Sequence, residues 1–192
     1  MGKRPASSNT VRIIAGSLGG RKIRFPDARG LRPTADRTRE TLFNWLTMDI
    51  QGSRCLDLFA GSGALGIEAC SRGADQVIMI EAVSKVSRQL KENVQLLGIE
   101  DRVQVVHSNA LSWMENTDEQ PFDLVFIDPP FADDVLQSVI DALISNDLLA
   151  SPARLYMERD IAQSLPVLPD NCSIIREKKA GQVGFCLIEC IP

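Results

Sequence analysis

An apolar stretch of the sequence ends abruptly in an acid and two prolines. Residues 122–131 read FDLVFIDPPF, so Asp128, Pro129, Pro130 and Phe131 follow a strand-like run. An exocyclic amino group on a nucleobase is a poor nucleophile because its lone pair is delocalised into the ring. A carboxylate and a carbonyl fixed by proline would accept its two hydrogens, and the phenylalanine ring would stack on a flipped base. The stretch predicts a cradle for an aromatic amine; the structural alternative is a turn that ends a strand.

A second group of residues forms a glycine-rich turn after another apolar run. The segment DLFAGSGALG contains Asp57 and matches G-x-G-x-x-G at Gly61, Gly63 and Gly66. Such a turn can seat a pyrophosphate on a helix N-terminus, but a carboxylate at Asp57 would repel one. A cationic ligand with an amino group, such as the methionyl end of S-adenosylmethionine, suits this acid better. Phe59, in the same turn, is assigned to the cofactor site.

Two more positions complete the predicted cofactor pocket. Glu81 ends the next apolar run about 20 residues later, where it would accept hydrogen bonds from two ribose hydroxyls. Asn109 and Ala110 follow the third run, where an adenine ring would lie. Asn109 has two open interpretations, a partner of the adenine amino group or an N-cap of a following helix. Asp57 and Glu81 likewise have a structural interpretation, as a loop cap and an exposed strand end.

The charge is divided unevenly along the 192 residues. Residues 1–39 contain ten Lys or Arg and two Asp, a net charge of +8, and the other 153 residues have a net charge of −12. A basic front segment on an acidic body predicts contact with a polyanion. The alternating segments RIIAG and RKIRFP favour a β-hairpin over a disordered basic tail. The predicted phosphate contacts are Arg12, Arg21, Lys22, Arg24 and Arg32.

The periodicity of apolar residues predicts an α/β protein. We expect a hairpin over residues 11–25 with its turn near Gly19 and Gly20, and a helix over 35–48 capped by Thr34. Strand and helix signals then alternate, which predicts a mostly parallel sheet covered on both faces, with an antiparallel terminal hairpin. The expected strands are 54–60, 76–82, 102–108, 122–128 and 154–160, with two more within 172–190; the expected helices are 63–73, 84–98 and 134–145.

Composition limits the class of protein. One domain with a substantial core fits this length, and neither a membrane span nor an apolar leader is visible, so we expect a cytoplasmic protein without membrane contact. The five cysteines are scattered without a C-x-x-C pair, and we expect them to be reduced and mostly buried. We expect no metal site, because the residues do not form a ligand cluster.

The motifs together resemble a known family. RIIAGSLGGRKI, LRPTADRTRETLFNWL, CLDLFAGSGALGIEACSRGA and VFIDPPF, in this order, look like the bacterial 16S ribosomal RNA guanine-N2 methyltransferases of the RsmD type. The resemblance spans about residues 11–185. It implies the Rossmann-like class I methyltransferase fold with seven strands, S-adenosylmethionine as donor, and methylation of one guanine N2 in 16S ribosomal RNA. It divides the chain into a basic extension, 1–34, and a methyltransferase domain, 35–192.

The resemblance also assigns residues to the site. Asp57, Gly61, Gly63, Glu81 and Asn109 would hold the cofactor and residues 128–131 the base. Thr34, Arg37 and Glu40 would lie over the mouth, with Arg37 on the cofactor side and Thr34 and Glu40 on the substrate side. Many amino-methylating relatives carry Asn at the position of Asp128, so the chain leaves open whether this carboxylate is a base or only a hydrogen-bond acceptor.

Several functions remain open at this point. The cradle chemistry also suits an adenine-N6 or DNA methyltransferase. A nicotinamide-dependent oxidoreductase is disfavoured by Asp57, and a non-catalytic RNA-binding assembly factor is disfavoured by the intact cofactor loop and cradle. We expect a monomer whose substrate is a small-subunit particle with bound ribosomal proteins, because a protein this small needs help to recognise a buried nucleotide.

Overall fold

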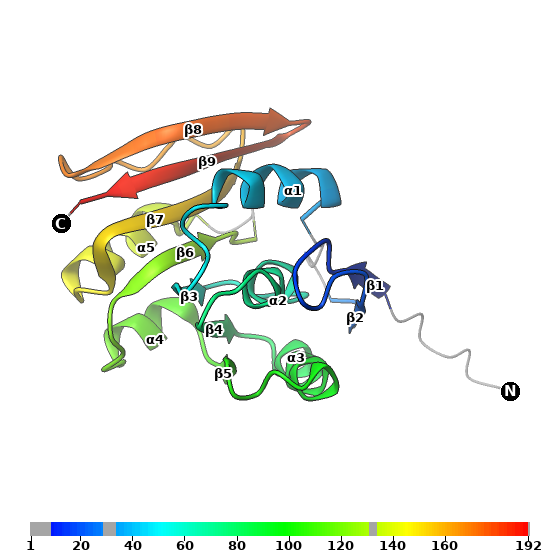
Figure 1. Cartoon of the computed structure of the whole chain (residues 1–192). Coiled ribbons are helices and arrows are strands. Elements are labelled where there is room, and N and C mark those ends of the chain that lie inside the picture. Colours follow the sequence, from blue (N-terminus) through cyan, green and yellow to red (C-terminus); the bar gives the residue numbers. More distant parts are fainter. Residues whose placement is uncertain (1–8, 29–33, 131–133, 192) are drawn as a thin grey trace, which may run out of the picture.

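A seven-stranded sheet forms the centre of the structure, a computed structural model that describes residues 9–28, 34–130 and 134–191 (Figure 1). The strand order is β5-β4-β3-β6-β7-β9-β8. Strands β3 to β7 are parallel, and β9 lies antiparallel between β7 and β8. This confirms the predicted fold, a mostly parallel sheet of seven strands with an antiparallel C-terminal hairpin.

The elements follow the chain in the alternation expected of βα units. The helices are α1 Asp36–Trp45, α2 Ala64–Ser71, α3 Ser84–Leu97, α4 Ala110–Glu115 and α5 Leu136–Ser145. The strands are β1 Asn9–Arg12, β2 Lys22–Phe25, β3 Arg54–Asp57, β4 Gln76–Glu81, β5 Val103–His107, β6 Phe122–Ile127, β7 Leu149–Asp160, β8 Cys172–Ala180 and β9 Val183–Cys190. Within the described ranges, none of the helices combines the length and apolar character needed to cross a membrane.

The helices cover the two faces of the sheet as separate layers (Figure 1). Apolar residues of α1, α2 and α3, such as Leu42, Ile67 and Leu90, form one buried cluster with one face of the sheet. Residues of α4 and α5, such as Met114 and Leu143, form a second cluster on the other face. The central strands are buried on both faces, which is why they read as continuous apolar runs rather than as alternating ones.

Several local predictions need correction. Ala35, not Thr34, occupies the N-cap of α1, and the Thr34 hydroxyl bonds elsewhere because a carboxylate is within reach. Strand β7 begins at Leu149, five residues before the predicted start. From the sequence, a helix after Asn109 is only one of two open interpretations, because the six residues of α4 are too few to show a helical period.

The cysteine prediction was wrong for one pair. Cys172 and Cys190 face each other across β8 and β9 and form a disulfide. Their pairing depends on strand register, which the spacing of 18 residues does not reveal. Cys55, Cys70 and Cys186 are free and buried, as expected.

The predicted hairpin is formed by β1 and β2, which pair from Asn9 with Phe25 to Arg12 with Lys22. Its connection docks against α2. Glu68 accepts the N–H groups of Ile14 and Ala15 at 2.7 and 3.0 Å, and the Ser71 carbonyl accepts that of Ser17 at 2.7 Å. The hairpin residues Val11, Ile13, Leu18, Ile23 and Phe25 are buried in the same cluster as α1, α2 and α3.

This docking brings Gly16 into close contact with α2. Gly16 has a φ of +81°, and a Cβ atom there would lie 1.9 Å from the Ser71 carbonyl oxygen. Both the backbone conformation and the missing space therefore require glycine.

We expect Gly16→Ala to lower the free energy of unfolding by roughly 2 to 4 kcal/mol, because the hairpin connection has to move away from α2. Gly20→Ala is the matched control. Gly20 has a φ of +84° but open space around its added Cβ, so its cost should be limited to about 1 kcal/mol of backbone strain. Urea unfolding measures both; equal losses would contradict the steric account.

Candidate active site

The predicted cofactor and base residues meet at the carboxyl ends of the parallel strands. Asp57 ends β3, Glu81 ends β4, and Asp128 directly follows β6. The strand order reverses between β3 and β6, because β4 and β5 continue on one side of β3 and β6 and β7 on the other. Ligands of open α/β sheets bind at such a switch point.

Asp57 is buried beneath the glycine-rich turn. It is 1% exposed, and its Oδ2 accepts the Gly66 N–H at 3.0 Å. Burial raises the pKa of its carboxyl from 3.8 to about 7, against the hydrogen bonds from the Gly66 and Phe59 backbone, which lower it. Asp57 therefore caps the loop, as its structural interpretation predicted. A role toward a cofactor is compatible with this and stays a prediction.

Glu81 links the end of β4 to the same turn. Its two carboxylate oxygens accept the N–H groups of Gly61 and Val83 at 3.0 and 2.6 Å. The side chain is half-buried rather than an exposed strand end. It therefore fixes the Gly61 end of the turn, where Phe59 is also half-buried.

The glycines of the motif serve packing as well as the turn. A Cβ on Gly63 would lie 2.6 Å from Leu90 of α3, and one on Gly66 would lie 2.7 Å from the Met79 sulfur of β4. A larger residue at Gly63 would therefore require the Leu90 side chain to shift, and one at Gly66 would require the Met79 side chain to shift. The match to G-x-G-x-x-G thus reflects close helix packing in addition to any ligand contact.

The N-cap interpretation of Asn109 is confirmed. Its side-chain oxygen accepts the Ser112 N–H at 3.2 Å at the start of α4. Asn109 is exposed, whereas Ala110 is buried in the cluster under α4 and α5. Contact of either residue with an adenine ring remains a prediction.

Asp128 lies where the cradle was expected. Its Oδ2 accepts a hydrogen bond from the Thr34 hydroxyl at 3.1 Å. Burial, together with the negative charges of Glu158 and Asp57, raises its pKa well above the usual range. Pro129 is buried and Pro130 is exposed, while Phe131 lies outside the described residues.

Glu158 and Tyr156 lie at this site but were not among the residues predicted from the sequence. Glu158 is 4% exposed near the end of β7, and its Oε1 accepts a hydrogen bond from the Tyr156 hydroxyl at 2.6 Å. Burial raises the pKa of both side chains. The available signal was a glutamate near the end of RLYMERD, the segment predicted to form the next strand along the chain after that of Asp128.

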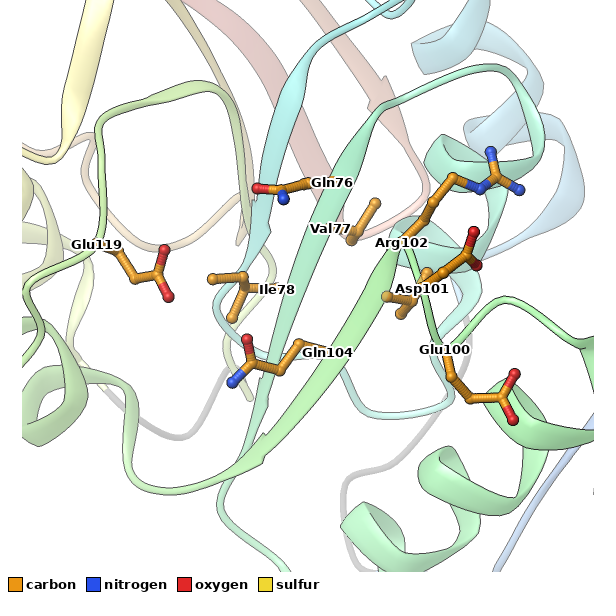
Figure 2. Close-up of a pocket in the computed structure, with 9 residues that line it drawn as sticks. Gln76, Val77, Ile78, Glu100, Asp101, Arg102, Gln104 and Glu119 are labelled. Carbon is orange, nitrogen blue, oxygen red and sulfur yellow. The ribbon is translucent and has the colours of Figure 1, made fainter.

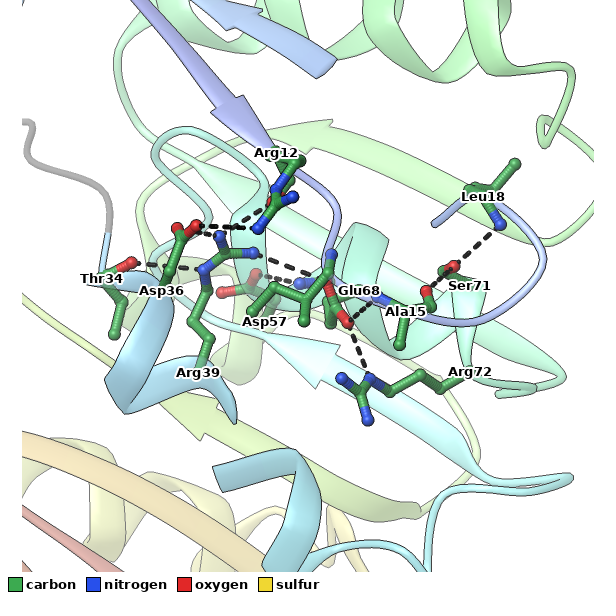
Figure 3. A network of polar contacts seen from close by, with 12 residues as sticks. Arg12, Ala15, Leu18, Thr34, Asp36, Arg39, Asp57, Glu68, Ser71 and Arg72 are labelled. Carbon is green, nitrogen blue, oxygen red and sulfur yellow. Dashed lines mark hydrogen bonds and ion pairs between the residues drawn. The ribbon is translucent and has the colours of Figure 1, made fainter. Parts of the chain in front are cut away.

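Arg39 was not predicted as a site residue either; its guanidinium is buried where the hairpin, α1 and α2 meet (Figure 3). It donates to the Arg12 and Thr34 carbonyls at 2.9 and 3.3 Å and forms ion pairs with Asp36 at 2.6 Å and Glu68 at 3.5 Å. Glu68 is itself fully buried. Arg39 thereby holds the backbone of Thr34, whose hydroxyl contacts Asp128.

The basic residues predicted to bind phosphate are divided by the structure. Lys22 and Arg24 are exposed on β2, and Arg12 is exposed on β1, 4.0 Å from Asp36. Arg21 donates instead to the carbonyls of Leu96 and Leu97 at the end of α3. Arg32 lies outside the described residues.

The other two residues predicted at the mouth lie on α1. Arg37 and Glu40 are both exposed, and their assigned roles at the mouth remain predictions. Their helix carries Arg39 between them, so the same segment supplies both the exposed side chains and the buried guanidinium.

A separate pocket of about 230 Å³ lies at the opposite, amino ends of the parallel strands (Figure 2). Its lining includes Gln76, Gln104, Arg102 and Glu119, and none of the carboxyl-end acids. Among the described residues no group of three or more His, Cys, Asp or Glu is placed to hold a metal ion. The candidate site therefore rests on the carboxyl-end residues.

Comparison with known proteins identifies the family. The profile of the family described as conserved hypothetical protein 95 matches residues 11–189. Ribosomal RNA small subunit methyltransferase D of Escherichia coli is 46% identical over 96% of this chain and 92% of its own length. The chain belongs to the RsmD family. The methyltransferase D of Haemophilus influenzae is 41% identical, over 96% of both chains.

Solved structures agree with this assignment to the RsmD family. A putative methyltransferase from Escherichia coli superposes with a TM-score of 0.88 at 43% identity, covering 96% of this chain and 99% of that one. A putative methylase from Haemophilus influenzae gives 0.83 at 39% identity, covering 96% and 100%. A putative methyltransferase complexed with SAH shares the fold alone, with a TM-score of 0.75 at 12% identity over 98% of this chain and 57% of that one.

The raised pKa of Asp57 predicts a pH-dependent stability. Between about pH 4 and 7 the folded protein keeps a proton that the unfolded chain has released, so Asp57 contributes a free energy of unfolding that falls as pH rises. Asp57→Asn keeps an acceptor oxygen without this titration. We expect its free energy of unfolding relative to wild type to increase from about pH 5 to about pH 8 in urea unfolding. An equal difference in the free energy of unfolding at both pH values would contradict the raised pKa of Asp57.

Proposed function

We propose that this protein transfers a methyl group from S-adenosylmethionine to the exocyclic N2 of a specific guanine in 16S ribosomal RNA. The observation that carries the proposal is the position of Asp128 and Pro129 beside the Asp57 and Glu81 turn, at the switch point of the sheet. Relatives with 46% and 41% identity are named small subunit ribosomal RNA methyltransferases. The names of these relatives do not state the methylated base or atom, so guanine N2 is proposed in addition to them.

The residues at the switch point fit S-adenosylmethionine. The carboxylates of Asp57 and Glu81 flank a turn that offers no basic side chain, which suits a ligand with sulfonium and ammonium charges and ribose hydroxyls. Gly61 and Gly63 keep the turn open, and Asn109 with Ala110 stands at the end of the neighbouring strand β5. S-adenosylmethionine, when bound, supplies an electrophilic methyl group.

The chain's own contribution to the reaction is to position the amino nitrogen. The Asp128 carboxylate and a backbone carbonyl of the Asp128–Pro130 segment accept the two N2 hydrogens, which favours the pyramidal nitrogen needed for attack. Thr34 holds one Asp128 oxygen at 3.1 Å, so the carboxylate is already oriented before the base arrives. Phe131 supplies the stacking face in this scheme.

RNA binding is assigned to the basic front segment. Lys22 and Arg24 project from the hairpin, and Glu68 and Ser71 fix the hairpin to the domain that carries Asp128. We place the monomeric enzyme in the cytoplasm, with a small-subunit particle and its bound ribosomal proteins as substrate. Arg37 and Glu40 lie on α1, the element that follows the hairpin along the chain. In this proposal both side chains face the opening of the cofactor and substrate site.

The decisive experiment is transfer of radiolabelled methyl groups to small-subunit particles and naked 16S RNA from cells lacking the protein, followed by nucleoside analysis. We expect label in N2-methylguanosine, with particles preferred over naked RNA. Label in N6-methyladenosine would keep the cradle but refute the guanine assignment, and label in neither would refute the proposed function.

Two variants separate chemistry from cofactor binding in the same assay. Asp128→Ala should reduce transfer by roughly a hundredfold or more with cofactor affinity unchanged, because it removes an acceptor at the reacting nitrogen. Asp57→Ala should weaken the cofactor affinity itself, which equilibrium dialysis measures. Equal loss of cofactor affinity in both variants would contradict this division.

The basic hairpin predicts a salt-dependent affinity for RNA. Lys22→Ala with Arg24→Ala should lower the slope of log affinity against log salt by roughly one for each phosphate that the hairpin no longer neutralises. Arg176→Ala with Lys179→Ala removes the same charges from exposed positions on β8 and should leave the slope unchanged. Filter binding of 16S RNA at several salt concentrations measures both; equal slopes for the two pairs would exclude a specific grip by the hairpin.

A further inference from the structure

Glu158 is a buried acid outside the residues to which the proposed function gives a role. It is 4% exposed near the end of β7, and the ion pairs of the described residues do not include it. Its carboxyl group accepts a hydrogen bond from the Tyr156 hydroxyl at 2.6 Å, and the nearby Thr34 hydroxyl lowers its pKa, which burial raises. A buried carboxyl held by a hydroxyl rather than by a cation is costly, which calls for an explanation.

Strand register places Glu158 next to Asp128. Strands β6 and β7 are parallel, with Phe126 opposite Tyr156 and Ile127 opposite Met157, so Asp128 and Glu158 are the next pair. Side chains alternate between faces along a strand, so both acids point to the same face as Phe126 and Tyr156, the face covered by α1 and α2. The shared face and register bring the two carboxyl groups together.

The Thr34 hydroxyl lies close to both acids. It donates to Asp128 Oδ2 at 3.1 Å, and it lowers the pKa of Glu158 against the effect of burial. A hydroxyl has one hydrogen, so it cannot donate to two ionised carboxylates at once. With that hydrogen directed at Asp128, the hydroxyl that donates to Glu158 is that of Tyr156, at 2.6 Å.

The surrounding groups add negative charge or none. Asp57 on β3 raises the proton affinity of Asp128 further, and the Tyr156 phenol and the Cys186 thiol of β9 have pKa values raised by burial. On α1, Arg39 reaches the Thr34 carbonyl at 3.3 Å but pairs with Asp36 and Glu68 instead of these acids, and Arg37 is exposed. The pair therefore favours binding a proton over releasing one.

We propose that Glu158 is a positioning residue that acts through Asp128, making Asp128 the acceptor of the proton that leaves N2 during methyl transfer. The inference rests on the proposed function. It answers the question that the sequence leaves open, whether Asp128 is a base or only a hydrogen-bond acceptor. An asparagine at this position would accept hydrogen bonds equally well, but it would not take the proton.

The step balances without a further reactant. The N2 lone pair forms a bond to the methyl carbon while the carbon–sulfur bond breaks. The electrons of the broken bond go to sulfur, which thereby loses its positive charge. The nitrogen, now carrying the positive charge, loses one proton to the Asp128 carboxylate. Asp128 later releases this proton to water. A negative neighbour strengthens Asp128 as a base in this step.

The first test does not depend on activity. The titration of Asp128 is followed by NMR of protein with ¹³C-labelled aspartate carboxyl groups, with Asp128→Asn to assign the signal. We expect Glu158→Gln to lower the Asp128 midpoint by roughly one pH unit or more, because the neighbouring charge is removed. Glu100→Gln, which removes one charge at an exposed turn, is the matched control and should leave the midpoint unchanged. An unchanged midpoint in Glu158→Gln would overturn the proposal.

The second test measures single-turnover methyl transfer across pH. In Glu158→Gln the acidic limb of the pH–rate profile should shift to lower pH by the same amount as the Asp128 midpoint. The maximal rate should fall by at most roughly tenfold for each pH unit by which that midpoint drops. Glu158→Asp, which keeps the charge, should restore the position of the limb. A lower rate with an unmoved limb would show a purely structural role and overturn the inference.

The two proposals fail in different ways. Absence of N2-methylguanosine refutes the proposed function while the NMR titration still decides whether Glu158 controls Asp128. Normal N2-methylguanosine with an unmoved Asp128 midpoint refutes only the role of Glu158.

Discussion

The buried guanidinium of Arg39 is the interaction on which the arrangement of the site depends. It joins the Arg12 carbonyl of the hairpin, the Thr34 carbonyl and the Glu68 carboxylate of α2, three segments separated in sequence. Glu68 in turn fixes the hairpin connection and pairs with Arg72 at 2.7 Å. Arg39 also pairs with Asp36 at 2.6 Å, so each of the two buried charges has a second ionic partner. Removing Arg39 would break the contacts with the Arg12 carbonyl, the Thr34 carbonyl and Glu68 at once. The pair thus sets the position of Thr34 and, through its hydroxyl, of Asp128.

The acids at the carboxyl ends of β3, β6 and β7 form a group of like charges, in contrast to the paired charges of Arg39 and Glu68. Asp57, Asp128 and Glu158 are held close together on one face of the sheet, with hydroxyl and N–H donors as partners instead of cations. Each has a raised pKa because burial penalises its charged form. The fold therefore maintains a region poor in positive charge, which a cationic ligand would stabilise. The described cations of the front segment lie on the hairpin and α1 instead.

The sequence predicted the sheet and its helices well because buried parallel strands and amphipathic helices have distinct periodicities. The sequence could predict that Asp57, Glu81 and Asp128 meet, because each stands at or just after the end of a strand and strand ends converge in this fold. Glu158 and Arg39 were missed because their importance depends on register and packing between distant segments. The misassigned cap at Thr34 has the same origin, since only the tertiary structure shows that its hydroxyl reaches Asp128 at 3.1 Å. The Cys172–Cys190 pair likewise required the register of β8 and β9.

The docking of the hairpin separates its anchoring groups from its exposed charges within a single short segment. Backbone groups and apolar side chains attach it to α2, through Glu68 and Ser71, while the charged side chains of Lys22 and Arg24 remain on the outside. Mutations at those outer positions can therefore accumulate without disturbing the attachment. By contrast, a Cβ atom on Gly16 would meet the backbone carbonyl of Ser71, which a change of the Ser71 side chain cannot remove, so Gly16 stays fixed. The exposed charges of the hairpin can thus change while its attachment to α2 stays the same.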